Sequence, residues 1–171
     1  MKGQVILSHG MESGPQATKV SAMGEAALAL GWSEVRPDFR DLDATKDVRR
    51  IDDRIGRILE HVRADGGPLV LAGSSMGAFA SGFASLRVAC VGLFLLAPPL
   101  AIEGYPRRLD AARVPTEIVH GWDDELIPAA EVIAFAGARR SALHLVDDSH
   151  RLTAHVSIIA DWFRRFLAAL A

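Results

Sequence analysis

Short apolar runs alternate with longer amphipathic segments along the chain, and this alternation constrains the fold more than any other feature. We expect strands over 4–8, 34–36, 69–72, 91–96, 116–120 and 142–146, and helices over 17–30, 47–63, 76–86, 129–136 and 154–169. Most of these strands are apolar on both faces, as in parallel sheets that helices cover on both sides. The sequence therefore predicts an α/β fold: a three-layer α/β/α sandwich with a mostly parallel, doubly wound sheet of about six strands.

Local signals set the expected helix boundaries. We expect Ser13 to cap the first helix, Pro15 to lie in its first turn and Gly31 to end it. The least regular stretch is 98–113, which has room for a long loop or one short helix. No internal repeat or linker interrupts the alternation, so we expect a single domain over residues 1–171.

Composition narrows the classes of function. The formal net charge is -2 and the arginine pairs are scattered among acidic residues, so we expect no nucleic-acid partner. The single cysteine, Cys90, excludes an intramolecular disulfide and suits a reducing compartment. The apolar run 5–7 is too short for a signal peptide, and no stretch reaches the length of a membrane span. We therefore expect a soluble cytoplasmic protein.

Polar side chains follow several of the expected strands, at the point where each strand ends. Ser74 and Ser75 follow the run 69–72, the segment "GWDDE" follows 116–120, and the segment "DDSH" follows 142–146. Sites in parallel sheets form at the carboxyl ends of the strands, which meet at one edge. A serine pair, an acid cluster and a histidine are thus expected at the same edge, in the chain order Ser, Asp, His.

Two glycines enclose the serine pair in the pattern Gly73-x-Ser75-x-Gly77. This pattern fits a sharp strand-turn-helix corner with a serine at its tip, where small flanking residues avoid clashes between strand and helix. The Ser75 hydroxyl would project from the sheet edge, beside N–H groups that open a helix and favour developing negative charge. A serine is a weak nucleophile unless a histidine base and an orienting acid accompany it.

Four segments of the chain resemble the motifs of small α/β-hydrolases. "GSSMG" is similar to the nucleophile elbow of that family and implies Ser75 as the nucleophile. "HGWDDELIP" resembles the acid loop and implies Asp124, whereas "DDSHRL" resembles the histidine loop and implies His150. "SHGMESGP" resembles the His-Gly segment, which implies that the backbone N–H groups of Met11 and Met76 form the oxyanion hole.

The resemblance implies a hydrolase that acts by acyl transfer to water on small or short-chain carboxylic esters or thioesters. The expected partner is a small acyl substrate, and no cofactor or metal is needed. The chain starts at the strand before the His-Gly segment, and the stretch 98–113 is too short for the lid domain that larger members insert there. We therefore expect a cap-less fold with an open site.

Structural interpretations of the same residues remain open at this point. Ser75 could be only a helix cap, His150 could be a surface histidine or a cap, and Asp123 is the alternative acid. His9 and His120, each at a strand end before a glycine, are more often scaffold than catalyst.

Two other functions fit the same motifs. A peptidase or amidase would use the same three residues, because all these reactions share a tetrahedral intermediate. A non-catalytic interaction protein could keep the fold and use the open site as a partner surface, since fold alone does not determine function.

Overall fold

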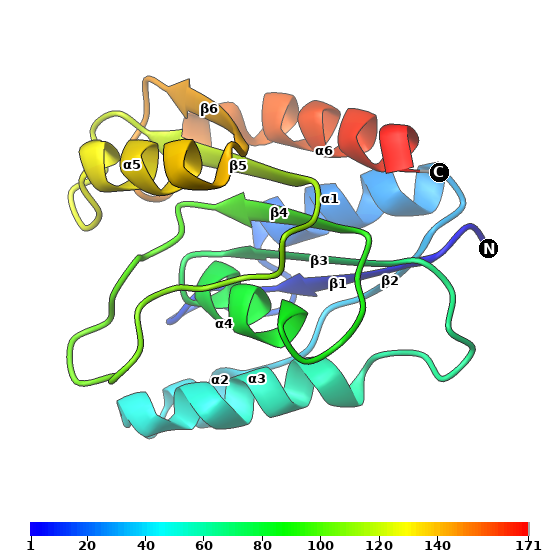
Figure 1. The fold of residues 1–171 in the computed structure, drawn as a ribbon, viewed down its shortest axis with the longest axis horizontal. Helices are drawn as coiled ribbons and strands as arrows, with labels where there is room; N and C mark the ends of the chain where they lie inside the picture. Colours follow the sequence, from blue (N-terminus) through cyan, green and yellow to red (C-terminus); the bar gives the residue numbers. More distant parts are fainter. Residues whose placement is uncertain (171) are drawn as a thin grey trace.

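All six strands of the sheet run parallel in the computed structural model, which describes residues 1–170. The order across the sheet is β2-β1-β3-β4-β5-β6 (Figure 1). The chain leaves β1 in one direction to form β2 and returns to form β3 on the other side, so the winding reverses between β1 and β3. The strands are β1 (Gln4–Ser8), β2 (Ser33–Val35), β3 (Leu69–Ser74), β4 (Gly92–Leu96), β5 (Thr116–Gly121) and β6 (Ala142–Val146).

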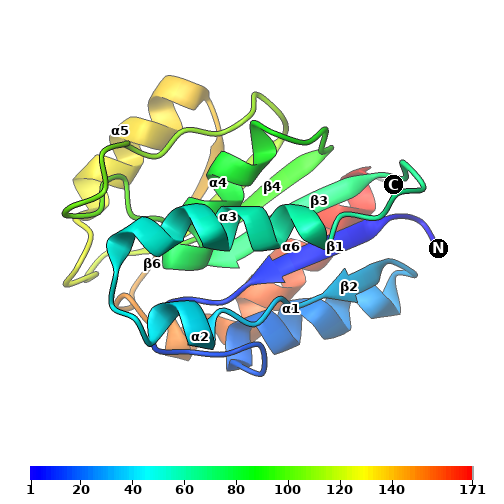
Figure 2. The ribbon, with the colours of Figure 1, turned by 90° about the horizontal axis from the view of Figure 1, so that it is seen from below.

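Helices cover both faces of this sheet, which confirms the predicted three-layer α/β/α architecture (Figures 1 and 2). The first and last helices pack together on one face, and α3, α4 and α5 contribute to the core on the other. No helix within residues 1–170 is long and apolar enough to cross a bilayer. The helices are α1 (Thr18–Ala29), α2 (Arg40–Asp43), α3 (Ile51–Glu60), α4 (Met76–Ser85), α5 (Ala129–Arg139) and α6 (Val156–Leu170), with 3-10 turns η1 (Val48–Arg50) and η2 (Thr153–His155).

The core has two layers because successive side chains of a strand point to opposite faces. Ile6 and Leu71 belong to the cluster beneath α3 and α4, whereas Val5, Leu7 and Val70 belong to the cluster beneath α1 and α6. All five side chains are completely buried. The continuous apolar runs of the sequence thus form the central strands, in which both faces are covered by helices and neither contacts solvent.

The expected cap of the first helix is wrong, and the second helix starts with a different geometry. The first helix begins at Thr18, and no side chain caps it, so Ser13 is not its cap. A turn closed by the Ala17 N–H on the Gly14 carbonyl (3.0 Å) precedes it, which puts Pro15 outside the helix. The helix expected over 47–63 starts as η1, with the Asp47 carboxylate accepting the Arg49 N–H at 3.0 Å, and its regular part is α3.

The segment 36–46, which follows β2, was not predicted to be helical. It contains the single turn α2, in which Leu42 is the only buried residue, so it gives no apolar periodicity to recognise. The stretch 98–113 contains no helix and runs as a loop. This excludes the short helix that the sequence allowed there.

Direct contact of backbone with backbone fixes α4 against the end of β1. A Cβ atom on Gly77 would overlap the Ser8 carbonyl, whose carbon lies only 2.6 Å from its position. A Cβ on Gly73 would lie 2.5 Å from the Gly77 carbonyl oxygen. Both glycines are therefore required by close approach, and the strand-turn-helix corner keeps its shape only with them.

Gly77→Ala should lower the free energy of unfolding by about 3 kcal/mol, because its methyl group has no space and the backbone must move. The matched control is Gly56→Ala inside α3, where no atom lies within 4 Å of the added methyl group. The control should be more stable by about 0.5 to 1 kcal/mol through helix propensity. Urea unfolding of both variants measures this, and equal stability of the two would contradict the packing argument.

Candidate active site

The corner between β3 and α4 holds Ser75 in a backbone conformation that is unfavourable for any residue except glycine. Its φ is 54° and its ψ is -118°. The Ser75 N–H donates to the Leu96 carbonyl at the end of β4 (2.9 Å), and its carbonyl accepts the Phe79 N–H inside α4 (3.1 Å). These bonds fix the corner from both sides, and strain of this kind persists only where the surrounding structure enforces it.

A continuous hydrogen-bonded chain joins the three polar groups that the sequence placed at this edge. His150 Nε2 lies 2.9 Å from Ser75 Oγ, and His150 Nδ1 lies 2.8 Å from Asp124 Oδ2. The alternative acid, Asp123, is exposed, and its side chain makes no hydrogen bond within residues 1–170. Asp124 is therefore the acid that contacts the histidine.

The partners of His150 determine its tautomer. An ionised Asp124 carboxylate only accepts, so Nδ1 carries the proton and donates it to Oδ2. Nε2 is then left with a lone pair that accepts the Ser75 hydroxyl proton. This arrangement suits removal of a proton from the serine, with the resulting imidazolium facing a carboxylate.

The Asp124 side chain is completely buried yet held as a carboxylate. Burial by itself would raise its pKa, but hydrogen bonds from His150 and from two backbone N–H groups outweigh burial and hold the pKa below 3.8. The two groups belong to Leu126 (2.9 Å) and Ile127 (2.8 Å), and both donate to Oδ1. The loop thus folds around its own acid and leaves Oδ2 to the histidine.

Two acids that the sequence analysis did not single out hold the histidine loop. The Glu125 carboxylate accepts the His150 backbone N–H at 3.1 Å. Asp148 accepts the Ala154 N–H (3.0 Å) and His155 Nδ1 (2.8 Å). Both lie in acid runs that otherwise look like solvated surface, and only the approach of the two loops distinguishes them.

The acid loop and the histidine loop touch through their backbones at the end of β5. A Cβ on Gly121 would lie 2.8 Å from the Ser149 carbonyl oxygen. The Asp123 N–H donates to the Asp148 carbonyl at 3.1 Å. The relative position of Asp124 and His150 is therefore set by main-chain contacts between the residues that immediately precede them.

The amides proposed for oxyanion binding lie beside this chain and are free to donate. Met76 is the first residue of α4 and directly follows Ser75. The segment before Met11 passes the serine closely, since a Cβ on Gly10 would lie 3.5 Å from the Ser75 Cβ. Within residues 1–170, neither the Met11 nor the Met76 N–H donates a hydrogen bond to a protein group.

Buried polar contacts hold the segment that carries Met11. His9 is buried, its Nδ1 meets the Gly10 carbonyl (2.7 Å), and its Nε2 accepts the Phe39 N–H (3.0 Å). Burial lowers the pKa of His9, so it stays neutral with the proton on Nδ1. The buried Arg54 guanidinium donates to the His9 carbonyl at 2.6 Å. His9 is thus engaged by the backbone on both nitrogens.

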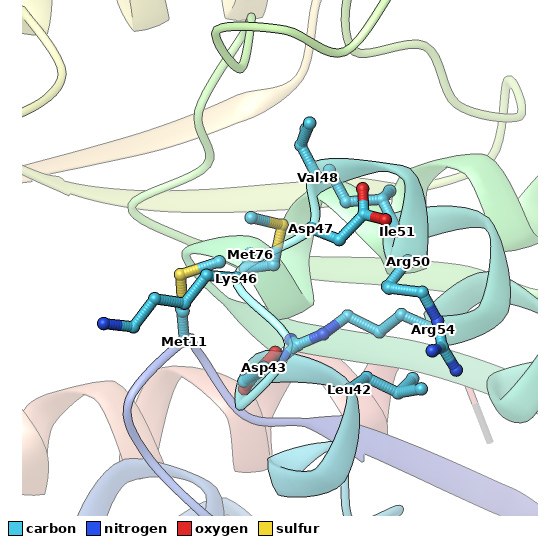
Figure 3. Close-up of a pocket in the computed structure, with 10 residues that line it drawn as sticks. All are labelled: Met11, Leu42, Asp43, Lys46, Asp47, Val48, Arg50, Ile51, Arg54 and Met76. Atoms are coloured by element: carbon cyan, nitrogen blue, oxygen red, sulfur yellow. Dashed lines mark hydrogen bonds and ion pairs between the residues drawn. The ribbon is translucent and has the colours of Figure 1, made fainter.

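A shallow hollow that is open to solvent adjoins Met11 and Met76 (Figure 3). Its other walls come from α2, from the segment that follows α2 and from the start of α3, including Leu42, Val48 and Ile51. The hollow could not be predicted from the sequence, because its lining comes from several segments and carries no motif.

Comparison with family models matches residues 1–157 to the family described as the alpha/beta hydrolase domain. A search among curated proteins found no match. Among solved structures, a candidate hydrolase of the alpha/beta superfamily from Xanthomonas campestris pv. campestris is 49% identical, with a TM-score of 0.91. The match covers 98% of this chain and 99% of that one.

More distant structures share the fold. A lid-less serine hydrolase from Xanthomonas campestris is 18% identical with a TM-score of 0.71, over 98% of this chain and 82% of that chain. Est1E from Butyrivibrio proteoclasticus is also 18% identical, with a TM-score of 0.67 over 98% of this chain and 87% of that chain.

The buried carboxylate predicts a pH-dependent contribution to stability. Because the pKa of folded Asp124 lies below the ordinary value of an aspartate, its contribution is present above the unfolded-state pKa and is lost as the pH falls through the folded-state pKa. Asp124→Asn should therefore be less stable than the wild type by about 2 kcal/mol at neutral pH. The difference in stability should narrow at acid pH, as Asp124 of the folded wild type becomes protonated.

Urea unfolding over a pH series measures this difference, with Asp123→Asn as the control. The control changes the neighbouring, exposed carboxylate in the same way and should follow the wild type at every pH. A difference for Asp124→Asn that stays constant across the acid range would contradict the argument.

Proposed function

The chain belongs to the α/β-hydrolase family, and from this premise we propose that it is a serine hydrolase of small or short-chain carboxylic esters or thioesters. The observation that carries the proposal is the hydrogen-bonded chain from Ser75 through His150 to Asp124. Such a chain activates a serine that would otherwise be a weak nucleophile.

In the first half of the proposed reaction, Ser75 Oγ attacks the acyl carbonyl carbon while its proton passes to His150 Nε2. Asp124 holds the imidazole in the required tautomer and stabilises the imidazolium that forms. Collapse of the tetrahedral intermediate breaks the bond to the alkoxide or thiolate. That leaving group takes the proton from His150, and the acyl group stays on Ser75.

Negative charge on the carbonyl oxygen needs donors that are already in place. The free N–H groups of Met11 and Met76 are the proposed donors, since neither has a protein acceptor within residues 1–170. Met76 also opens α4, whose positive end favours an anion. A fixed pair of donors of this kind stabilises the transition state more than the substrate.

In the second half, water attacks the acyl group on Ser75 and gives its proton to His150 Nε2. The second tetrahedral intermediate then expels Ser75, which takes the proton back from His150, and the free acid leaves. The proton is thus returned at the end of each turnover, so the proposed cycle needs only the substrate and water.

The openness of the site supports small substrates. The stretch 98–113 is a loop without a helix, and the hollow beside Met11 and Met76 is shallow and open to solvent. A shallow, open surface offers little apolar area to bury a long acyl chain. We therefore propose short acyl groups as the substrates.

A fluorophosphonate probe should label the purified protein on Ser75, because the probe reacts with an activated serine. Labelling should vanish in Ser75→Ala and persist in Ser74→Ala, the matched control one residue away. Peptide mass spectrometry identifies the modified residue. A folded protein without labelling would contradict the proposal and favour the interaction-protein interpretation.

Turnover of a short p-nitrophenyl ester should fall by about 10⁴-fold or more in both Ser75→Ala and His150→Ala, because each removes a member of one cooperating unit. The double variant should lose little beyond either single variant, since their effects are not additive. Steady-state kcat measures this. Independent, multiplicative losses would argue against a shared proton-transfer chain.

A further inference from the structure

The hollow beside the candidate oxyanion hole is placed to receive part of the substrate. Met11 and Met76 supply the two proposed oxyanion N–H groups and also line the hollow, where their side chains lie next to each other (Figure 3). A carbonyl oxygen bound by those amides would therefore sit at the mouth of the hollow. This inference rests on the proposed function, because it concerns the substrate of the same site.

The part of the substrate that can enter the hollow is its acyl group and not its leaving group. The leaving group must take its proton from His150 Nε2, so it has to lie on the histidine side of Ser75. Ser75, His150 and Asp124 do not line the hollow, whereas Met76, which directly follows Ser75, does. With the carbonyl oxygen on the amides and the leaving group at His150, the acyl chain is the substituent left to extend into it.

The lining of the hollow combines an apolar surface with charges that are almost all neutralised. Leu42, Val48 and Ile51 join the two methionines as its apolar part. Two of the charged lining residues, Asp43 and Arg54, pair with each other at 2.7 Å. Two others pair with residues that do not line the hollow: Asp47 with Arg49 (2.7 Å) and Arg50 with Asp53 (2.5 Å).

Lys46 is the exception among the charged residues that line the hollow. Within residues 1–170, no carboxylate oxygen lies within 4.0 Å of its ammonium group. Figure 3 shows the Lys46 side chain running beside Met11, while the Asp47 carboxylate points to the other side. Lys46 therefore supplies one uncompensated positive charge at the rim of the hollow, on the side of Met11.

The backbone holds this lysine in an unusual way. Lys46 has φ 53°, in the left-handed region that a lysine seldom adopts, at the end of the turn that follows α2. Its N–H donates to the Asp43 carbonyl (3.1 Å), and Asp43 is in turn fixed by the buried Arg54. The position of Lys46 at the rim is thus built on a buried ion pair.

We propose that the hollow is an acyl subsite for short acyl groups that end in a carboxylate, with Lys46 as the group that recognises the charge. The apolar surface would contact the methylene chain, and the ammonium would pair with the terminal carboxylate. The preferred substrates are then monoesters or monothioesters of short dicarboxylic acids.

Two esters with equal chain length and the same leaving group test this directly. Mono-p-nitrophenyl adipate carries a terminal carboxylate, and p-nitrophenyl hexanoate has a methyl group in its place. The wild type should show a higher kcat/KM for the adipate ester. The advantage should shrink as salt is added, because partly exposed ion pairs are screened.

Variants at Lys46 identify the source of that preference. The ratio of kcat/KM for adipate over hexanoate should fall about five-fold in Lys46→Met and further in Lys46→Glu, as expected for one partly exposed ion pair. Lys46→Asn provides a second neutral variant that tolerates left-handed backbone. Lys2→Met, the same change at the far end of the sheet, should leave the ratio unchanged.

Each alternative result of these assays contradicts a specific step of the argument. Turnover of hexanoate with no preference for adipate, or a ratio that all Lys46 variants leave intact, would overturn this inference alone. A Lys46-dependent preference for a hexanoate ester of 4-hydroxybenzoate, whose leaving group is charged, would overturn the acyl-side assignment. If neither ester turns over and Ser75 is not labelled, the proposed function fails together with this inference.

Discussion

The packing of α4 against the end of β1 is the contact on which the rest of the site depends. Gly77 allows the helix backbone to meet the Ser8 carbonyl without an intervening side chain. Because β3 turns directly into α4, this contact fixes Ser75 at the tip of the corner in a strained conformation. It also brings the segment of Gly10 and Met11 beside the serine, so one approach of two backbones places both the serine and the amides proposed to serve it.

Parallel topology supplies the remaining groups, and main-chain contacts keep them in place. The winding reverses between β1 and β3, which opens a crevice at their carboxyl ends. The acid and the histidine come from the ends of β5 and β6, which pair with each other. Gly121 lets their loops touch, and the amides around Asp124 keep it a buried carboxylate. No single loop carries the whole hydrogen-bonded chain.

The sequence predicted the elements that burial determines and missed those that loop contacts determine. Central strands were recognisable because both of their faces are apolar, and the corner because Gly73 and Gly77 enclose Ser75. The contact of Asp124 with His150 followed from the family motifs. Ser13 was misjudged because a cap depends on where the chain turns, which a single polar residue does not show.

The hollow escaped prediction for a different physical reason. The segment between β2 and α3 is held by polar contacts, of which the Arg54 pair with Asp43 is the buried one, and such contacts leave no periodic pattern in a sequence. It lies outside the sheet, so its exposed residues can change without disturbing the contact that fixes Ser75. This separates the parts of the proposed enzyme: strand ends hold the reacting groups, whereas a polar segment at the rim would decide which acyl group is accepted. In a fold without a lid, that rim is the surface available for such a choice.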